Sequence, residues 1–270
     1  MPVDLASPKH RSVSQLESYS DCGIRYKLER IDKVPQSDAW WNVGGTSVHY
    51  AIEQYEKKRA EGETLSVEDT QKIYANKLEE LSPTEADEWL MGWRKASKGK
   101  EDKEWWIEHG EDMVFRYVQA AETRTYEILR DPIGNPIVEW VFDLDVDGII
   151  VRGYIDQAFL SSNGSAVLVR DVKAGKSTPS DSLQTAMYGW ALRKILNADV
   201  RWGSYWMARK GEQTPPIDLL ARHPWEEIVY RVHTMDKAEN AGIYLPRVSS
   251  FCISCSVKDY CPAQGNGSWT

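Results

Sequence analysis

Hydrophobic and polar positions form their clearest pattern in the middle of the chain. Three runs rich in apolar and β-branched residues, at 137–145, 149–160 and 166–173, have the length and composition of β-strands. Asp147-Gly148 and Asn163-Gly164 separate these runs, and both pairs favour tight hairpin turns. The pattern therefore predicts a three-stranded meander at the centre of the chain.

The flanking segments repeat apolar residues at helical spacing. A capping Ser12 precedes Leu16 and Tyr19. The segment 61–136 carries few strand signals and is predicted to be a mostly helical insertion. The pattern predicts helices at 12–27, from Thr46 or Ser47 to about Ala60, at 105–130, at 179–196 and from Met235 onward, and further strands at 201–207 and 227–232.

The register of the hairpins brings acidic side chains together. If Asn163 and Gly164 are the turn residues, Asp156 lies directly opposite Asp171. Facing like charges repel, so a fold tolerates them when something such as a bound cation compensates. Lys173 follows Asp171 by two positions and therefore projects from the same face. The first hairpin places Glu139 opposite Asp156, where it could serve as an accessory carboxylate.

Two predicted helices carry further polar side chains. His49 and Glu53 are four residues apart and share a helix face, as do Gln184 and Tyr188. A single helical histidine is more often a packing or surface residue than a metal ligand. By itself, the position of His49 leaves both roles open.

Cysteine usage indicates a second site. The chain has four cysteines: Cys22 near the N-terminus, and Cys252, Cys255 and Cys261 in a C-x2-C-x5-C cluster. In an intracellular protein such a cluster favours a metal site over disulfides. Four thiolates could hold structural zinc or an iron–sulfur cluster. Either group would tie the two ends of the chain together and stabilise the fold.

Composition limits the class of protein. The 270 residues are 41% hydrophobic and 27% charged, which suits one globular domain spanning 1–270. No membrane-length apolar run or signal-peptide core occurs, so we expect a soluble, cytoplasmic protein. A net charge of −8 argues against nonspecific attraction to nucleic acid, although it permits a local basic groove. The lysines and tryptophans of 93–106 fit either an exposed loop or an element that guides a DNA strand.

These residues together resemble a known family. The order His49, Asp156, Asp171-x-Lys173, Gln184-x3-Tyr188, bracketed by one early and three late cysteines, is similar to the RecB-like, Cas4-like branch of the PD-(D/E)XK nuclease superfamily. The opening S-x-S-x-L-x-x-Y-x-x-C resembles the same branch. Two positions depart from it: Gly23 stands where proline often follows the first cysteine, and the acidic residue before the lysine is Asp171, where Glu is equally common.

The resemblance implies an α/β fold with a restriction-endonuclease-like core, in which helices flank a mixed β-sheet. It also implies a [4Fe-4S] cluster, in preference to zinc, on a cluster-binding element made of Cys22 and residues 251–262. The active site implied by the resemblance would hold Mg²⁺ or Mn²⁺ on the carboxylates of Asp156 and Asp171, the imidazole of His49 and the backbone carbonyl of Val172. Lys173 would orient or activate the attacking water, Gln184 and Tyr188 would position the DNA strand or support the lysine, and Glu53 would support the site from behind.

The expected activity is metal-dependent hydrolysis of DNA. No G-x4-G-K-[ST] loop is present, so we expect no fused helicase motor. We expect an exonuclease that acts on DNA ends or single strands in recombination, repair or phage DNA metabolism, as a homo-oligomer or with a helicase or recombination partner. A Cas4-type nuclease of CRISPR spacer acquisition is the nearest alternative. A catalytically weak DNA-end-binding subunit is an alternative from a different class.

Overall fold

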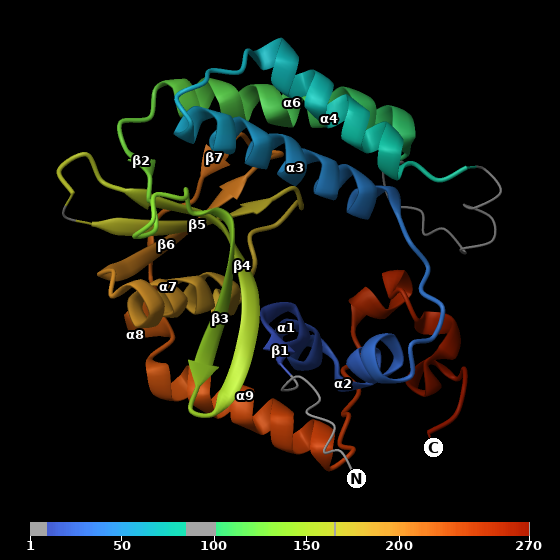
Figure 1. Ribbon diagram of the computed structural model, residues 1–270. Coiled ribbons are helices and arrows are strands. Elements are labelled where there is room, and N and C mark those ends of the chain that lie inside the picture. The colour runs from blue at the N-terminus through green and yellow to red at the C-terminus, as the bar shows by residue number, and fades with distance from the viewer. Residues whose placement is uncertain (1–9, 85–100, 165, 270) are drawn as a thin grey trace, which may run out of the picture.

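The computed structural model describes residues 10–84, 101–164 and 166–269. In this part of the chain, eight strands form one mixed sheet, and helices cover both of its faces (Figure 1). The three-layered α/β architecture confirms the predicted fold class. No helix in the described part of the chain combines the length and apolar character needed to cross a lipid bilayer.

The central meander has the predicted register. Strands β3 (Val138–Val146) and β4 (Ile149–Leu160) pair antiparallel, with Val146 opposite Ile149. Strand β5 (Val167–Lys173) then pairs antiparallel with the end of β4, with Leu160 opposite Val167. Strand β6 (Val200–Met207) lies parallel to β5. Four two-residue strands complete the sheet: β1 (Arg11–Ser12), β2 (Glu127–Ile128), β7 (Glu212–Gln213) and β8 (Ile217–Asp218).

One helical layer packs on the face of the sheet that carries Val167, Val169 and Asp171. It contains α1 (Val13–Asp21), α7 (Leu183–Leu196), α8 (Leu219–Arg222) and α9 (Trp225–Asn240), as Figure 1 shows below the sheet. The main core forms here because α7 is apolar on nearly every side and buries Ala186, Met187 and Leu192 against the strands.

The second helical layer contains α3 (Trp40–Ala60), α4 (Val67–Leu81) and α6 (Lys103–Glu122), at the top of Figure 1. Its core gathers Val48, Ile52 and Trp106 against Val172 and Trp206 of the sheet. The predicted helical insertion at 61–136 corresponds to α4 and α6, whereas residues 85–100, and with them most of the 93–106 stretch, lie outside the described part. Strands β4 and β5 therefore lie between two separate apolar cores.

The predicted start of α3 is wrong. The helix begins at Trp40, not at Thr46 or Ser47, because Trp40 and Val43 are buried in the second core. The glycines that suggested a helix start lie inside the helix. A Cβ atom on Gly44 would come within 2.0 Å of the Trp106 ring, so this glycine permits α6 to pack closely against α3.

Two further boundaries differ from the prediction. The long helix predicted at 105–130 ends at Glu122, and Glu127–Ile128 pair with β4 as strand β2. The predicted strand at 227–232 is wrong, because these residues belong to helix α9. The β-branched residues there suggested a strand, but the buried positions Ile228, Val232 and Met235 follow helical spacing.

The two ends of the chain meet beside the sheet. Helices α2 (Gly23–Tyr26) and η1 (Lys27–Ile31) pack against residues 243–269, which contain the short helices η2 (Ser250–Ser254), η3 (Lys258–Tyr260) and η4 (Pro262–Gln264). We refer to α2, η1 and residues 243–269 as the cysteine module. Its buried core consists of only Ile24, Leu28 and Val257 among the described residues.

Candidate active site

The candidate site lies at a fork in the sheet. Strands β4 and β5 are paired as far as Gln157 and Arg170, and beyond this pair they diverge, since β5 continues beside β6 while β4 continues beside β3. Asp156 and Asp171 are the first residues past the fork. The register that predicted them as neighbours is therefore confirmed, and they stand where the backbone ladder between the two strands ends.

Asp156 is fixed from two sides. The backbone N–H of Val172 donates to one carboxylate oxygen at 2.9 Å, and the Tyr188 hydroxyl donates to the other at 3.0 Å. The N–H of Val172 is available because its strand has left β4 at the fork. Tyr188 thus holds a carboxylate, and Val172 contributes its N–H to the site. The predicted role of the Val172 carbonyl as a metal ligand stays a prediction.

Asp171, Lys173 and Gln184 form a connected group. The Lys173 ammonium lies 2.9 Å from one Asp171 oxygen and donates to Gln184 Oε1 at 2.7 Å. The Gln184 amide in turn donates to the Tyr188 hydroxyl at 2.8 Å. Asp171 is 1% exposed, so this lysine partly compensates a buried carboxylate. The prediction that Gln184 supports the lysine matches this geometry.

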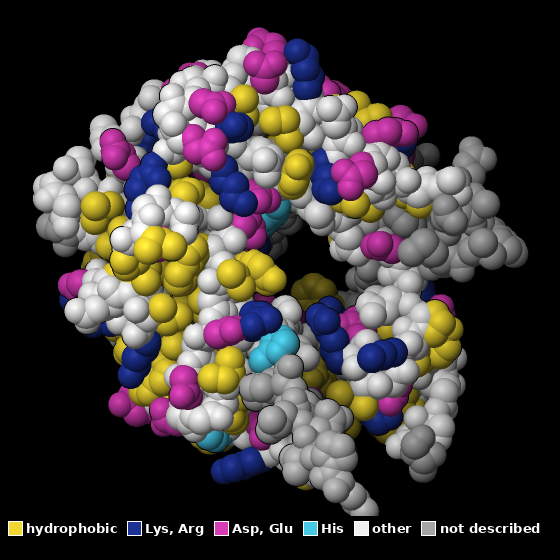
Figure 2. Space-filling view, viewed as in Figure 1, with side chains coloured by type: hydrophobic (Ala, Val, Ile, Leu, Met, Phe, Trp, Pro, Cys, Tyr) yellow, Lys and Arg dark blue, Asp and Glu magenta, His cyan; other side chains and the backbone are white. Residues whose placement is uncertain are grey.

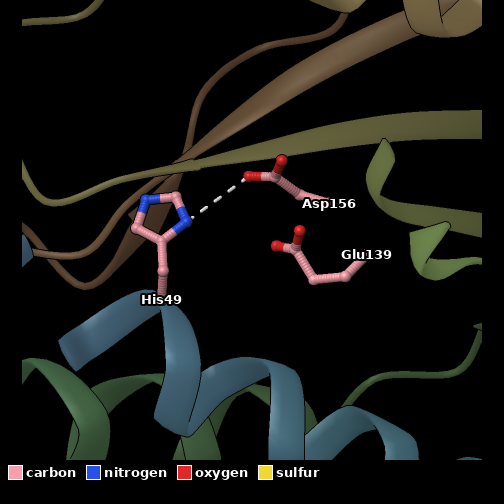
Figure 3. Close-up of side chains that lie close together, drawn as sticks. All are labelled: His49, Glu139 and Asp156. Atoms are coloured by element: carbon pink, nitrogen blue, oxygen red, sulfur yellow. Dashed lines mark ion pairs between the residues drawn. The ribbon is translucent and has the colours of Figure 1, made fainter. Parts of the chain in front are cut away.

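His49 and Glu139 approach Asp156 from the opposite side. Figure 3 shows His49 on α3 facing both carboxylates, with its Nδ1 3.6 Å from Asp156 Oδ2. One ligand atom from each of His49, Glu139 and Asp156 lies within 4.8 Å of the others. Glu139 has a positive φ of 48°, a backbone conformation that is uncommon outside glycine and that interrupts its pairing with β4.

The electrostatics of these groups suit a cation. Burial, together with the Asp156 charge, raises the pKa of Glu139 to about 7. Burial and then the Asp156 charge also raise the pKa of Asp171 well above its ordinary value. Burial lowers the pKa of His49, which favours the neutral imidazole that binds metals. Carboxylate oxygens with one imidazole are donors that Mg²⁺ and Mn²⁺ accept.

Lys173 is held in its charged form. Burial by itself would lower the pKa of this lysine, but the carboxylates of Asp171, Asp156 and Glu17 together more than offset that effect and raise the pKa. An ammonium can donate to a phosphate oxygen or orient a water molecule, whereas it cannot accept a proton. Between the two roles expected for Lys173, the geometry therefore favours orientation and charge compensation.

A buried network fixes α3, and with it His49, against the sheet. Arg124 contacts the two carboxylate oxygens of Glu56 at 2.7 and 2.9 Å, and Tyr117 donates to Glu56 at 2.5 Å. Gln157, next to Asp156 on β4, donates to the Tyr117 hydroxyl at 2.7 Å. The network thus connects the helix that carries His49 to the strand that carries Asp156.

Glu139 and Glu53 have neighbours that differ in part from those expected from the sequence. Glu139, expected only as an accessory group, belongs to the triad of possible metal ligands, and its position opposite Asp156 in the hairpin was the sequence signal for it. Glu53, expected behind His49, forms an ion pair with Lys57 at 2.6 Å. Asp171 is not part of the triad of His49, Glu139 and Asp156. Asp156 lies between the other two members of this triad and the group formed by Asp171, Lys173 and Gln184.

Three of the four cysteines, Cys22, Cys255 and Cys261, lie against the small core of the cysteine module. The backbone N–H of Arg247 donates to Cys22 Sγ, and that of Ser249 donates to Cys252 Sγ, each at 3.4 Å. In the described part of the chain, however, no three cysteine sulfurs lie within 4.8 Å of one another. The iron–sulfur staple therefore stays a prediction.

The structure also explains the glycine after the first cysteine. A Cβ atom on Gly23 would lie 2.7 Å from the backbone nitrogen of Leu245. Any larger side chain would push the two ends of the chain apart. The departure from proline at this position therefore fits the close approach of α2 to the C-terminal segment.

Comparison with known proteins identifies the family of this chain. The sequence profile of the PD-(D/E)XK nuclease superfamily matches residues 10–262. The chain belongs to the PD-(D/E)XK nuclease superfamily. It is similar to the gene 69 protein of Mycobacterium phage L5, at 33% identity over 284 aligned positions that cover 93% of this chain and 96% of the relative. The gene 69 protein of Mycobacterium phage D29 is 32% identical with the same coverage of both chains.

Membership in this superfamily gives the site its chemistry. A divalent cation, when bound, would supply Lewis-acid stabilisation of the charge that develops on the phosphate. Asp156, Glu139 and His49 lie close enough together that they could hold one, and Asp171 adds a second buried carboxylate beside Asp156. Lys173 can orient a water or compensate phosphate charge, while Gln184 and Tyr188 fix the lysine and Asp156 in place.

Proposed function

We propose that this protein is a divalent-metal-dependent DNA exonuclease that hydrolyses phosphodiester bonds at DNA ends. The observation that carries the proposal is the fork, where Asp156, Asp171 and Lys173 meet with Gln184 and Tyr188 already hydrogen-bonded behind them. A purely structural or DNA-binding protein has no need for two adjacent carboxylates in a partly buried position, because their repulsion costs stability.

Space beside the site supports a nucleic-acid substrate. Figure 2 shows a hollow in the middle of the molecule, with acidic and histidine side chains at its rim. In Figure 1 the same region lies between α3, α1 and the cysteine module. A strand of DNA in this hollow would lie next to His49 of α3, and a free end enters such a space more easily than a continuous duplex does.

The RecB-like, Cas4-like branch is part of the proposal. Support comes from the contacts of the branch-type residues: Gln184 and Tyr188 contact the lysine and Asp156, and His49 lies opposite Asp156. The curated relatives come from phages, which favours phage DNA recombination, repair or replication over CRISPR spacer acquisition.

A [4Fe-4S] cluster on the four cysteines is also proposed. Four sulfurs around tetrahedral zinc would lie about 3.8 Å apart, given Zn–S bonds of about 2.3 Å. The cysteine sulfurs of the described module lie farther apart than four zinc ligands would, which argues against zinc. The N–H donors of Arg247 and Ser249 support the proposal, because hydrogen bonds to cysteine sulfur are one means by which proteins tune iron–sulfur clusters.

Cleavage of end-labelled DNA tests the proposed activity. Linear and circular DNA, single- and double-stranded, would be incubated with Mg²⁺, Mn²⁺ or EDTA. We expect metal-dependent degradation of linear DNA alone, and the label released first gives the polarity. Cutting of circular DNA would indicate an endonuclease, whereas binding without cleavage under every metal would favour a DNA-end-binding subunit.

Two variants connect this activity to the fork. Asp171→Ala and Lys173→Ala should each lower the cleavage rate by at least about 100-fold, because each removes charge at the reacting phosphate or at the metal. DNA binding should persist in both variants. Lys237→Ala, at an exposed position on α9, is the matched control and should cleave at the wild-type rate.

Spectroscopy of protein purified under anaerobic conditions tests the cluster. We expect a brown protein with broad absorbance near about 400 nm and about four iron atoms per chain. A colourless protein that carries stoichiometric zinc would contradict the cluster without affecting the proposed activity.

A further inference from the structure

A cavity outside the active site lies between α1, α9 and the segment that leads into the cysteine module. It is open to solvent and has a volume of about 320 Å³. Its wall includes Tyr19 and Ser20 of α1, Tyr230 and Arg231 of α9, and Leu245 and Arg247 of the connecting segment. This volume is at the small end of ligand pockets, so it suits a group the size of one nucleotide.

The cavity wall combines an exposed aromatic ring with a free cation. Tyr230 is 70% exposed, far more than a tyrosine that serves packing. Arg247 makes no side-chain ion pair or hydrogen bond within the described residues, while its backbone N–H is anchored to Cys22 Sγ at 3.4 Å. Aromatic faces that stack on bases, beside basic groups that contact phosphates, are the features with which proteins bind single-stranded nucleic acid.

A short chain of contacts connects the cavity to the active site. Arg231, in the cavity wall, forms an ion pair at 2.7 Å with Asp181, two residues before the start of α7. The first turn of α7 carries Gln184, the hydrogen-bond partner of Lys173. Glu17 on α1 lies within electrostatic range of both Lys173 and Asp181. The cavity is therefore a neighbour of the fork, on the side where α1 and α7 meet.

We propose that this cavity is a nucleotide subsite for the DNA strand that is being cleaved, with a base stacked on Tyr230 and its phosphate bound by Arg247. The proposal rests on the proposed nuclease function and specifies how the same strand is held away from the scissile bond. Arg231 contributes less charge, because Asp181 and Glu227 already neutralise it. These two ion pairs hold Arg231 in the cavity wall.

Binding of single-stranded DNA in EDTA tests the subsite without cleavage. Fluorescence anisotropy with a labelled 20-nucleotide strand would compare the wild type with Tyr230→Ala and Tyr230→Phe. We expect Tyr230→Ala to bind about 5- to 150-fold more weakly, the range typical of one lost stacking contact, and Tyr230→Phe to bind like the wild type. Phe115→Ala, which removes an exposed aromatic ring on α6, is the matched control and should not change the affinity.

Salt dependence provides a readout that a purely structural role of Arg247 would not change. Arg247→Ala should reduce the slope of log affinity against log salt concentration by about 0.7, the value for one lost phosphate contact on a single strand. Arg247→Lys should restore the slope. Arg222→Ala, at an exposed position on α8, should leave it unchanged.

The outcomes separate this proposal from the proposed function. If the wild type degrades DNA but the Tyr230 and Arg247 variants keep its affinity and salt slope, the subsite is wrong and the nuclease function stands. If the variants weaken binding as expected but no metal supports cleavage, the subsite stands and the nuclease function fails. A wild type that neither binds nor cleaves DNA would overturn both.

Discussion

The fork and the cysteine module differ in what holds their functional atoms in place. At the fork, Asp156 accepts two hydrogen bonds, Lys173 makes two polar contacts, and the whole group lies between two apolar cores. In the cysteine module, three of the described residues form the buried core, and the sulfurs of Cys22 and Cys252 each accept a weak N–H contact. The fork is preorganised by protein contacts, whereas the module has few contacts of its own and would depend on the proposed cluster for its rigidity.

The strongest test of this difference removes one thiolate. If the proposed cluster is present, Cys252→Ala should destroy it and loosen the module, because metal binding contributes much of the folding energy of such small units. We expect loss of the absorbance near about 400 nm and rapid proteolysis within residues 243–269. Mn²⁺ affinity at the fork should change less than about twofold, as measured by electron paramagnetic resonance.

A control for that experiment is Asp259→Asn, which alters an exposed position in the same module. It should keep the absorbance and the resistance to protease. If Cys252→Ala instead abolished Mn²⁺ binding, the two regions would be parts of one cooperative unit, and the comparison between them would be wrong.

The next largest effect concerns the framework behind the fork. Glu56→Ala should lower the free energy of unfolding by about 3–5 kcal/mol, because Arg124 would keep a buried charge without its partner. Urea denaturation measures this loss. Glu122→Ala, at an exposed position on α6, should change stability by less than about 0.5 kcal/mol. Equal losses in the two variants would show that the network adds no special stability to α3.

A smaller effect tests whether the hydrogen bond from Tyr188 helps to hold Asp156 in place. Tyr188→Phe removes one hydroxyl that contacts both Asp156 and Gln184, and it leaves the ring packing intact. We expect Mn²⁺ affinity or the cleavage rate to fall about 10- to 100-fold, the usual cost of losing a hydrogen bond behind a metal ligand. Tyr205→Phe is the control, since its hydroxyl contacts Thr185 and Asp181, away from Asp156. An unchanged Tyr188→Phe enzyme would mean that Asp156 needs no support.

The smallest effect depends on pH. Arg209 and Lys176 contact Glu101 beside the end of β5, and although burial acts in the opposite direction, they lower its pKa in the folded protein. This ion pairing therefore stabilises the fold above the unfolded pKa of about 4.3 and is lost as pH falls through the lower folded pKa. The wild type should lose stability relative to Glu101→Gln between about pH 5 and pH 3. Urea denaturation at several pH values checks this, and a constant difference would contradict it.

Sequence reasoning succeeded where the determinants are local. The turns at Asp147-Gly148 and Asn163-Gly164 set the pairing of β3, β4 and β5, and that pairing brings Asp156 to Asp171. The helical spacing of Gln184 and Tyr188 likewise predicted that both reach one point. In these cases the spacing of residues along the chain and the type of turn are enough to predict which side chains meet.

Sequence reasoning failed where contacts between residues far apart in the chain decide the structure. The start of α3 depends on Trp106, some sixty residues away, which fills the space left by Gly44. The segment 227–232 has strand-like residues, yet it is helical because Ile228 and Val232 bury against the main core. The hairpin register predicted Glu139 only as an accessory carboxylate, and its place in the candidate triad depends on the position of His49 on another element. None of these partners is visible in a local window of sequence.

Because the fork depends on strand register, the active site forms only when the sheet has folded correctly. A slip of one residue between β4 and β5 would send every side chain of one strand to the opposite face and separate the two aspartates. A partly folded or misregistered chain therefore has no active centre. A newly made nuclease is thus harmless to the DNA around it until its own sheet has been assembled correctly, and the folding reaction itself acts as the safeguard.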